Sequence, residues 1–123
     1  METDRNKTYG TEATAYFAAP MVIPGVSGFS SQWHLQNLIY PGIDLNVTDV
    51  WADYRGNGVV VGVIDTGIDY NHSDLNPNYR FDLDYDARSG DNDSNASSSD
   101  DNHGTAVAGV IGATFGNGNV VGV

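Results

Sequence analysis

Residues 59–64 form an apolar run, VVVGVI, in which hydrophobic and polar positions do not alternate. Such a run predicts a strand that is covered on both faces, as in a parallel α/β sheet. The turn sequence GNG at residues 56–58 precedes it, and Asp65 follows it directly. A carboxylate at the end of a buried strand is costly unless it is paired or hydrogen-bonded. The pattern therefore indicates a functional role for Asp65.

A second pattern, in residues 105–114, has the spacing of a helix. One face carries its larger side chains, Val107, Val110, Ile111 and Thr114. Most other positions are Ala or Gly, and small residues let a helix lie close against a sheet. We therefore expect a packed helix that begins near His103, with Asp101 or Asn102 as its cap.

Shorter patterns predict the other elements. Residues 48–54 (TDVWADY) have apolar side chains at helical spacing and predict a short helix. In residues 32–38 (QWHLQNL), Trp33 and Leu35 are expected to cover the edge of the core. Pro and Gly interrupt residues 1–31, which predicts a mostly extended lead-in.

The composition narrows the possible partners. Five basic and sixteen acidic residues give a formal net charge of −11, which repels nucleic acid and anionic membranes. The same charge suits a divalent cation, a basic substrate or solvation alone, and the acids cluster in residues 80–101. No cysteine is present, which excludes disulfides and thiolate metal sites. No apolar run approaches the roughly 20 residues of a membrane span.

Asp65 and His103 are the candidate chemical groups. In an open parallel sheet, functional side chains collect at the carboxyl ends of the strands, where Asp65 is expected. The positive end of a helix disfavours an imidazolium, which helps to keep His103 a neutral base. We therefore expect the two side chains to approach each other at the edge of the sheet.

The compound motif is DTG at residues 65–67, then NHSDL at residues 71–75, then HGTAVAG from His103. Over residues 32–123 the chain resembles the subtilisin-like serine peptidases, and within them the kexin-like branch. The resemblance implies an α/β fold of three layers, a mostly parallel sheet flanked by helices, which is incomplete in this chain. Residues 32–123 would be the N-terminal part of the catalytic domain, and residues 1–31 an extended lead-in or a propeptide remnant.

The resemblance also implies a serine endopeptidase that cleaves polypeptide substrates with an Asp-His-Ser triad. Asp65 would orient His103, which would act as the general base, and Gly104 would leave room beside the imidazole. The serine and the oxyanion-hole asparagine of the family have no match in the chain. The remainder of the catalytic domain would supply both. Asp100 matches an acid that the branch uses toward basic substrates, whereas Thr66 stands where a second aspartate is common.

Calcium is the cofactor that the resemblance implies, since hard cations take carboxylate and carbonyl oxygens. Asp74 matches the carboxylate of a tight site, with Thr114, Asn117 and Val120 in the loop that completes it. A second site would use three acids of the acidic stretch, Asp82, Asp91 and Asp93. The alternative for this stretch is a solvated run of charge.

Two other functions fit some of the residues. An inactive relative would keep the calcium-binding and protein-binding surface without catalysis, which the missing serine motif favours. A DTG sequence also occurs in aspartic peptidases, but these are all-β, and residues 105–114 predict a helix. The resemblance implies a secreted or cell-envelope protein, although the first residues have no signal-peptide pattern.

Overall fold

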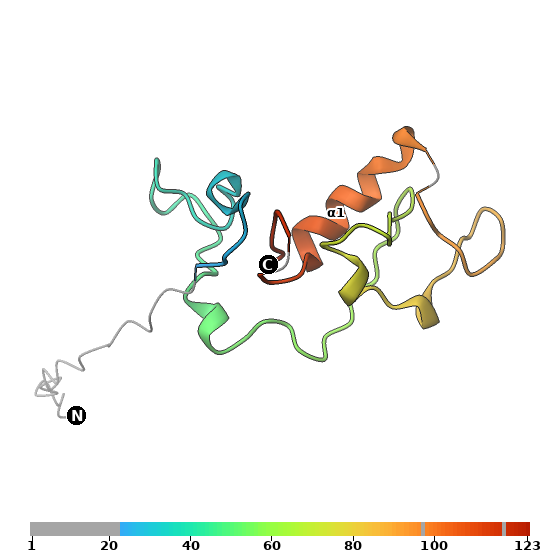
Figure 1. Cartoon of the computed structure of the whole chain (residues 1–123), viewed down its shortest axis with the longest axis horizontal. Helices are drawn as coiled ribbons and strands as arrows, with labels where there is room; N and C mark the ends of the chain where they lie inside the picture. The colour runs from blue at the N-terminus through green and yellow to red at the C-terminus, as the bar shows by residue number, and fades with distance from the viewer. Residues whose placement is uncertain (1–22, 97, 117) are drawn as a thin grey trace, which may run out of the picture.

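The computed structural model of the chain describes residues 23–96, 98–116 and 118–123 (Figure 1). Within these ranges it contains one α-helix, α1 (Asn102–Gly112). The helix predicted for residues 105–114 is therefore confirmed, although it begins three residues earlier and includes His103. It ends because Ala113 takes an extended backbone conformation, with φ −60° and ψ 141°.

The other helical elements are single 3₁₀ turns: η1 (Phe29–Ser31), η2 (Val50–Ala52), η3 (Asn76–Asn78), η4 (Phe81–Leu83) and η5 (Ser99–Asp101). The short helix predicted for residues 48–54 is reduced to η2. Its continuation is interrupted by the turn that follows, in which Gly56 and Gly58 have positive φ angles of 70° and 79°. Left-handed backbone of this kind is incompatible with a continuing right-handed helix.

The segment 59–64 differs from the buried strand that its sequence predicts. Val59, Val60 and Val61 are 68%, 56% and 55% exposed, and no described residue pairs with the segment as a neighbouring strand. In the described part of the chain, β-pairing is limited to two isolated bridges, Ile68 with Asn95 and Asp86 with Asp91. The backbone N–H and C=O groups of a strand bond to a neighbouring strand. Residues with a β preference therefore do not form a sheet where no neighbour is present.

The hydrophobic core joins the two ends of the described chain. Its buried side chains are Val26, Phe29, Leu35, Trp51 and Val121. Phe115 packs edge-on against Trp51, with 5.4 Å between ring centroids. The expectation for Leu35 is confirmed because it is fully buried, whereas Trp33 is exposed. The burial of Val26 and Phe29 makes the described part of the lead-in a component of the core; residues 1–22 lie outside the described ranges.

Gln32 fastens this N-terminal segment to the C-terminal one. Its Nε2 donates to the carbonyl of Val121 at 2.7 Å, and its Oε1 accepts the N–H of Val121 at 3.0 Å. Nearby, the N–H of Gly28 donates to the carbonyl of Asn119 at 2.7 Å. The amide of Gln32 thus replaces a strand neighbour for one buried residue of the C-terminal segment.

No helix in the described ranges is long and apolar enough to cross a membrane.

We expect Gln32→Ala to lower the free energy of unfolding by about 1–3 kcal/mol, because the buried N–H and C=O of Val121 would both lose their partner. Urea denaturation followed by Trp fluorescence measures the change. Ser30→Ala, at an exposed position of the same segment, is the control and should leave the midpoint unchanged. Equal stability of Gln32→Ala and wild type would contradict this role.

Candidate active site

Asp65 and His103 lie in direct contact, as their positions in the sequence predict. Nδ1 of His103 is 2.8 Å from each carboxylate oxygen of Asp65. Asp65 follows the segment 59–64, and His103 is the second residue of α1. The side chain of Asp65 is only 14% exposed, whereas that of His103 is 73% exposed. The imidazole therefore has one edge against a shielded carboxylate and its other edge open to solvent.

The hydrogen bond with His103 holds the pKa of Asp65 below its ordinary value, with a second hydrogen bond from the N–H of Thr66. Desolvation acts in the opposite direction and is outweighed. Asp65 is therefore ionised at neutral pH and can only accept, so the proton of this hydrogen bond is on Nδ1 of His103. That tautomer leaves the lone pair of Nε2 on the open edge, which is the arrangement of a general base.

Gly104 allows α1 to approach the segment after Asp65. Gly104 is buried, and a Cβ at this position would overlap the carbonyl oxygen of Gly67 and lie 3.1 Å from Cβ of Asp65. The space beside the imidazole that the sequence predicts is thus occupied by backbone of the neighbouring segment. A substrate contact at Gly104 stays a prediction. Asp100, also predicted to face the substrate, is exposed in η5, three residues before His103.

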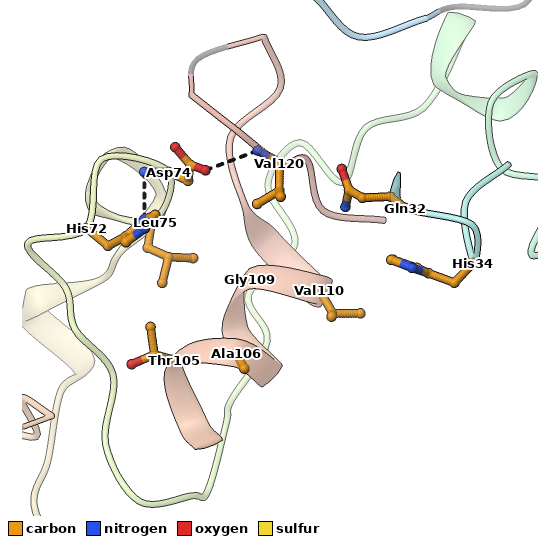
Figure 2. Close-up of a pocket in the computed structure, with 10 residues that line it drawn as sticks. All are labelled: Gln32, His34, His72, Asp74, Leu75, Thr105, Ala106, Gly109, Val110 and Val120. Atoms are coloured by element: carbon orange, nitrogen blue, oxygen red, sulfur yellow. Dashed lines mark hydrogen bonds between the residues drawn. The ribbon is translucent and has the colours of Figure 1, made fainter. Parts of the chain in front are cut away.

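Asp74 is the most deeply buried carboxylate of the described chain, with 1% of its surface exposed. Its Oδ2 accepts the N–H of Val120 at 3.2 Å (Figure 2). The same oxygen accepts the N–H of Asn119 at 3.1 Å, and Oδ1 accepts the hydroxyl of Ser73. Its own carbonyl accepts the N–H of Thr114 at 2.8 Å. The structure thus brings together three of the four residues predicted for the first calcium site. The fourth, Asn117, lies outside the described residues.

Burial by itself would raise the pKa of Asp74, but the N–H groups of Val120 and Asn119 and the hydroxyl of Ser73 outweigh it, so the pKa is lowered. The carboxylate is therefore ionised at neutral pH and already neutralised in part by hydrogen-bond donors. The other carboxylate oxygen, Oδ1, accepts from Ser73 and lies against Gly118, where a Cβ would overlap it. A calcium ion at Asp74 would draw most of its six to eight oxygen ligands from backbone carbonyls and the loop amide.

The acids predicted for the second calcium site are engaged separately. Asp82 forms a two-pronged ion pair with Arg80, at 2.6 and 2.7 Å. Asp93 accepts the hydroxyl of Tyr70 at 3.0 Å, and Asp91 accepts the N–H of Asp93. Within the described residues, no three acidic or histidine side chains are grouped so that they could hold a metal ion.

Two features of the site have no counterpart in the sequence predictions. The first is a cavity of about 330 Å³ between residues 32–34, residues 72–75 and α1, with His34 and His72 in its lining (Figure 2). Nε2 of His34 is buried there, and no residue in the described ranges forms a hydrogen bond with it. The second is a pair of threonine hydroxyls that join α1 to the segment after Asp65. The sequence signal for this second feature was the threonine in each motif, Thr66 in DTG and Thr105 in HGT.

Comparison with known proteins agrees with the family resemblance that the motifs indicate. A family model described as the subtilase family matches residues 56–123. Kexin of Saccharomyces cerevisiae is 43% identical over 90 residues, which are 72% of this chain and 11% of that protein. Neuroendocrine convertase 2 of Mus musculus is 43% identical over 103 residues, which are 77% of this chain and 16% of that protein. The chain thus spans 11–16% of the length of these curated relatives.

We expect the acid sensitivity of the fold to depend on Asp74. Its folded-state pKa is lowered, so its contribution to stability is present above its unfolded-state pKa of about 4 and is lost as the pH falls through the folded-state value. Asp74→Asn should lower the melting temperature at pH 7 and flatten the decline of stability between about pH 5 and pH 2. Thermal unfolding by circular dichroism across that range measures both effects. Asp49→Asn, at an exposed position, is the matched control, and an unchanged acid decline in Asp74→Asn would contradict the assignment.

Proposed function

The chain belongs to the subtilase family, in its kexin-like branch, and from this premise we propose that it supplies the aspartate and the histidine of a serine endopeptidase. The observation that carries the proposal is the 2.8 Å contact between Nδ1 of His103 and the carboxylate of Asp65, with the opposite edge of the imidazole exposed. A base that is oriented on one side and open on the other can accept the proton of a serine hydroxyl.

The proposed reaction is acyl transfer. Nε2 of His103 removes the proton from the serine hydroxyl as the hydroxyl oxygen attacks the peptide carbonyl, and later returns the proton to the leaving amine. Asp65, which remains ionised, holds the Nδ1–H and stabilises the imidazolium formed in between. The serine and the oxyanion-hole asparagine come from a further segment of the catalytic domain, because this sequence has no matching motif for either.

The same segment would complete the fold. We assign residues 32–123 to the N-terminal part of a three-layer α/β catalytic domain, in which residues 59–64 become a central strand. The exposure of Val59, Val60 and Val61 supports this assignment, since three neighbouring valines left open to water are an apolar surface suited to burial against other strands. The burial of Val26 and Phe29 extends the packed region into residues 23–31.

The proposed substrate is a polypeptide. Two features favour substrates with basic side chains. The net charge is −11, and Asp100, three residues before His103 in the sequence, has an exposed carboxylate. Thr66 in place of a second aspartate removes one negative charge beside the dyad. We place the protein outside the cell or in its envelope, by analogy with the family.

A catalytically inactive calcium-binding and protein-binding module is the second candidate. The observation that favours it is the absence of a serine motif from the sequence. The Asp65–His103 contact favours the peptidase instead, because a binding module has no need for an oriented, exposed base. The same contact argues against an aspartic peptidase, which places a second aspartate rather than a histidine beside the first.

The catalytic assignment is tested in the complete protein that carries the serine-bearing segment. His103→Ala should lower kcat by roughly 10⁶-fold, because the base is lost, and Asp65→Asn by roughly 10⁴-fold, because the imidazole takes the wrong tautomer. Hydrolysis of a fluorogenic peptide with basic residues before the scissile bond measures the rates, and Asp53→Asn, at an exposed position, is the control. The 123-residue chain alone should not react with a fluorophosphonate probe. Full activity in His103→Ala would exclude the mechanism.

Calcium is the proposed structural cofactor. Asp74, the backbone carbonyls of Thr114 and Val120, and the amide of Asn117 would hold it. Millimolar calcium should raise the melting temperature of the chain by several degrees, because a ligand that binds only the folded state stabilises it. Asp74→Asn should remove the shift, whereas Asp82→Asn should leave it in place because Asp82 is paired with Arg80. No shift in the wild-type chain would remove calcium from the proposal.

A further inference from the structure

The first turn of α1 is hydrogen-bonded to the segment that carries Asp65. Helices begin with backbone N–H groups that have no partner inside the helix, and a side chain at the N-cap position often satisfies one of them. The side chain of Asp101, the N-cap residue of α1, accepts the hydroxyl of Ser98 rather than a backbone N–H of the helix. The N–H of Gly104 instead donates to Oγ1 of Thr66, at 3.2 Å.

The hydroxyl of Thr66 makes a second hydrogen bond to the same turn. It donates to the carbonyl of Asp101 at 2.9 Å, while it accepts from Gly104. One hydroxyl therefore uses both its donor and its acceptor capacity on the two sides of His103. Thr66 is also joined to Asp65 through its own N–H, which donates to the carboxylate at 2.7 Å.

A second threonine makes the reciprocal connection. Oγ1 of Thr105, in the helix, accepts the N–H of Asp69, in the loop, at 2.8 Å. The two hydroxyls thus bind the segment 65–69 to the first turn of α1 at two points. Gly104 makes this approach possible because it has no side chain to separate the two backbones.

We propose that Thr66 is a positioning residue, which fixes the first turn of α1 relative to Asp65 and so holds His103 within hydrogen-bonding distance of the carboxylate. The inference rests on the proposed role of the Asp65–His103 pair. The tolerance is small, because successive helical residues are displaced by about 1.5 Å along the axis, and a nitrogen–oxygen hydrogen bond is lost by about 3.6 Å. A shift of the first turn by less than one residue would therefore separate the pair.

The threonine side chain is suited to this function by its hydroxyl alone. Valine has nearly the same shape but would leave the N–H of Gly104 and the carbonyl of Asp101 without this partner. Serine keeps the hydroxyl and loses only a methyl group. The comparison of Thr66→Val with Thr66→Ser therefore separates the hydrogen bonds from the packing of the side chain.

The test uses NMR on the 123-residue chain and needs no peptidase activity. The readouts are the downfield resonance of the Nδ1 proton of His103, the carboxyl titration of Asp65, and hydrogen exchange at the amide of Gly104. In Thr66→Val, the resonance should weaken or disappear, the pKa of Asp65 should rise toward its ordinary value, and the amide should exchange about tenfold faster. Thr66→Ser should resemble wild type in all three.

Thr48→Val is the matched control, since it removes a threonine hydroxyl from a buried position outside the contact between α1 and the segment 65–69. An intact resonance and an unchanged Asp65 titration in folded Thr66→Val would overturn the proposal. So would global unfolding of Thr66→Val and Thr66→Ala while Thr66→Ser stays folded, because the hydroxyl would then have a general structural role. A wild-type chain without the resonance would remove the dyad and the proposal together. Absence of peptidase activity from the complete wild-type protein, with the NMR results as expected, would count only against the proposed function.

Discussion

The close approach of α1 to the segment after Asp65 is the constraint on which the candidate site depends. It is possible because Gly104 faces the carbonyl of Gly67, where no side chain would fit. This approach allows a carboxylate and an imidazole that are 38 residues apart in sequence to lie 2.8 Å from each other. The hydrogen bond between them then keeps Asp65 ionised and fixes the proton on Nδ1 of His103.

The rest of the described chain is held together more by buried polar contacts than by a large apolar core. Five side chains form the hydrophobic cluster, which is small for a chain of this length. Gln32 and Asp74 compensate by bonding the backbone of residues 119–121, which has no strand neighbour. Each of these side chains is buried and bonds donors or acceptors that are distant in sequence, so its loss would leave backbone groups of residues 119–121 without that partner.

The sequence predicted the local features well and the non-local ones in part. The spacing of the apolar residues identified α1. The motifs indicated that Asp65 would approach His103 and that Thr114 and Val120 would lie near Asp74, but not that Ser73 and Asn119 would donate to its carboxylate. Periodicity could not show whether the run at residues 59–64 has a neighbour to pair with, because it describes only how a strand would be buried. Frequent Pro and Gly predicted an extended lead-in and did not indicate that Val26 and Phe29 are buried, since irregular backbone can still bury its side chains.

A count of acids was similarly insufficient for the second metal site. Asp82 is paired with Arg80, two residues away, because a local ion pair restricts fewer degrees of freedom than a cage assembled from distant residues. The sequence shows both residues but not which partner the carboxylate will take. In contrast, Asp74 accepts two backbone N–H groups from the distant residues Asn119 and Val120. These donors compensate for the burial of its carboxylate.

The geometry of the dyad does not depend on the sheet that the family implies. Asp65 follows a segment that is exposed and unpaired, yet its carboxylate contacts His103, because hydrogen bonds from Thr66 and Thr105 bind residues 65–69 to α1. Orientation of the base is therefore a local property of two short segments, and its entropic cost is borne when the chain folds rather than during the reaction. A serine from elsewhere in the domain would need only to approach the exposed Nε2 edge of His103. The valines of residues 59–61 provide an apolar surface against which the serine-bearing part of the fold can pack, so assembly and completion of the active site would be one event.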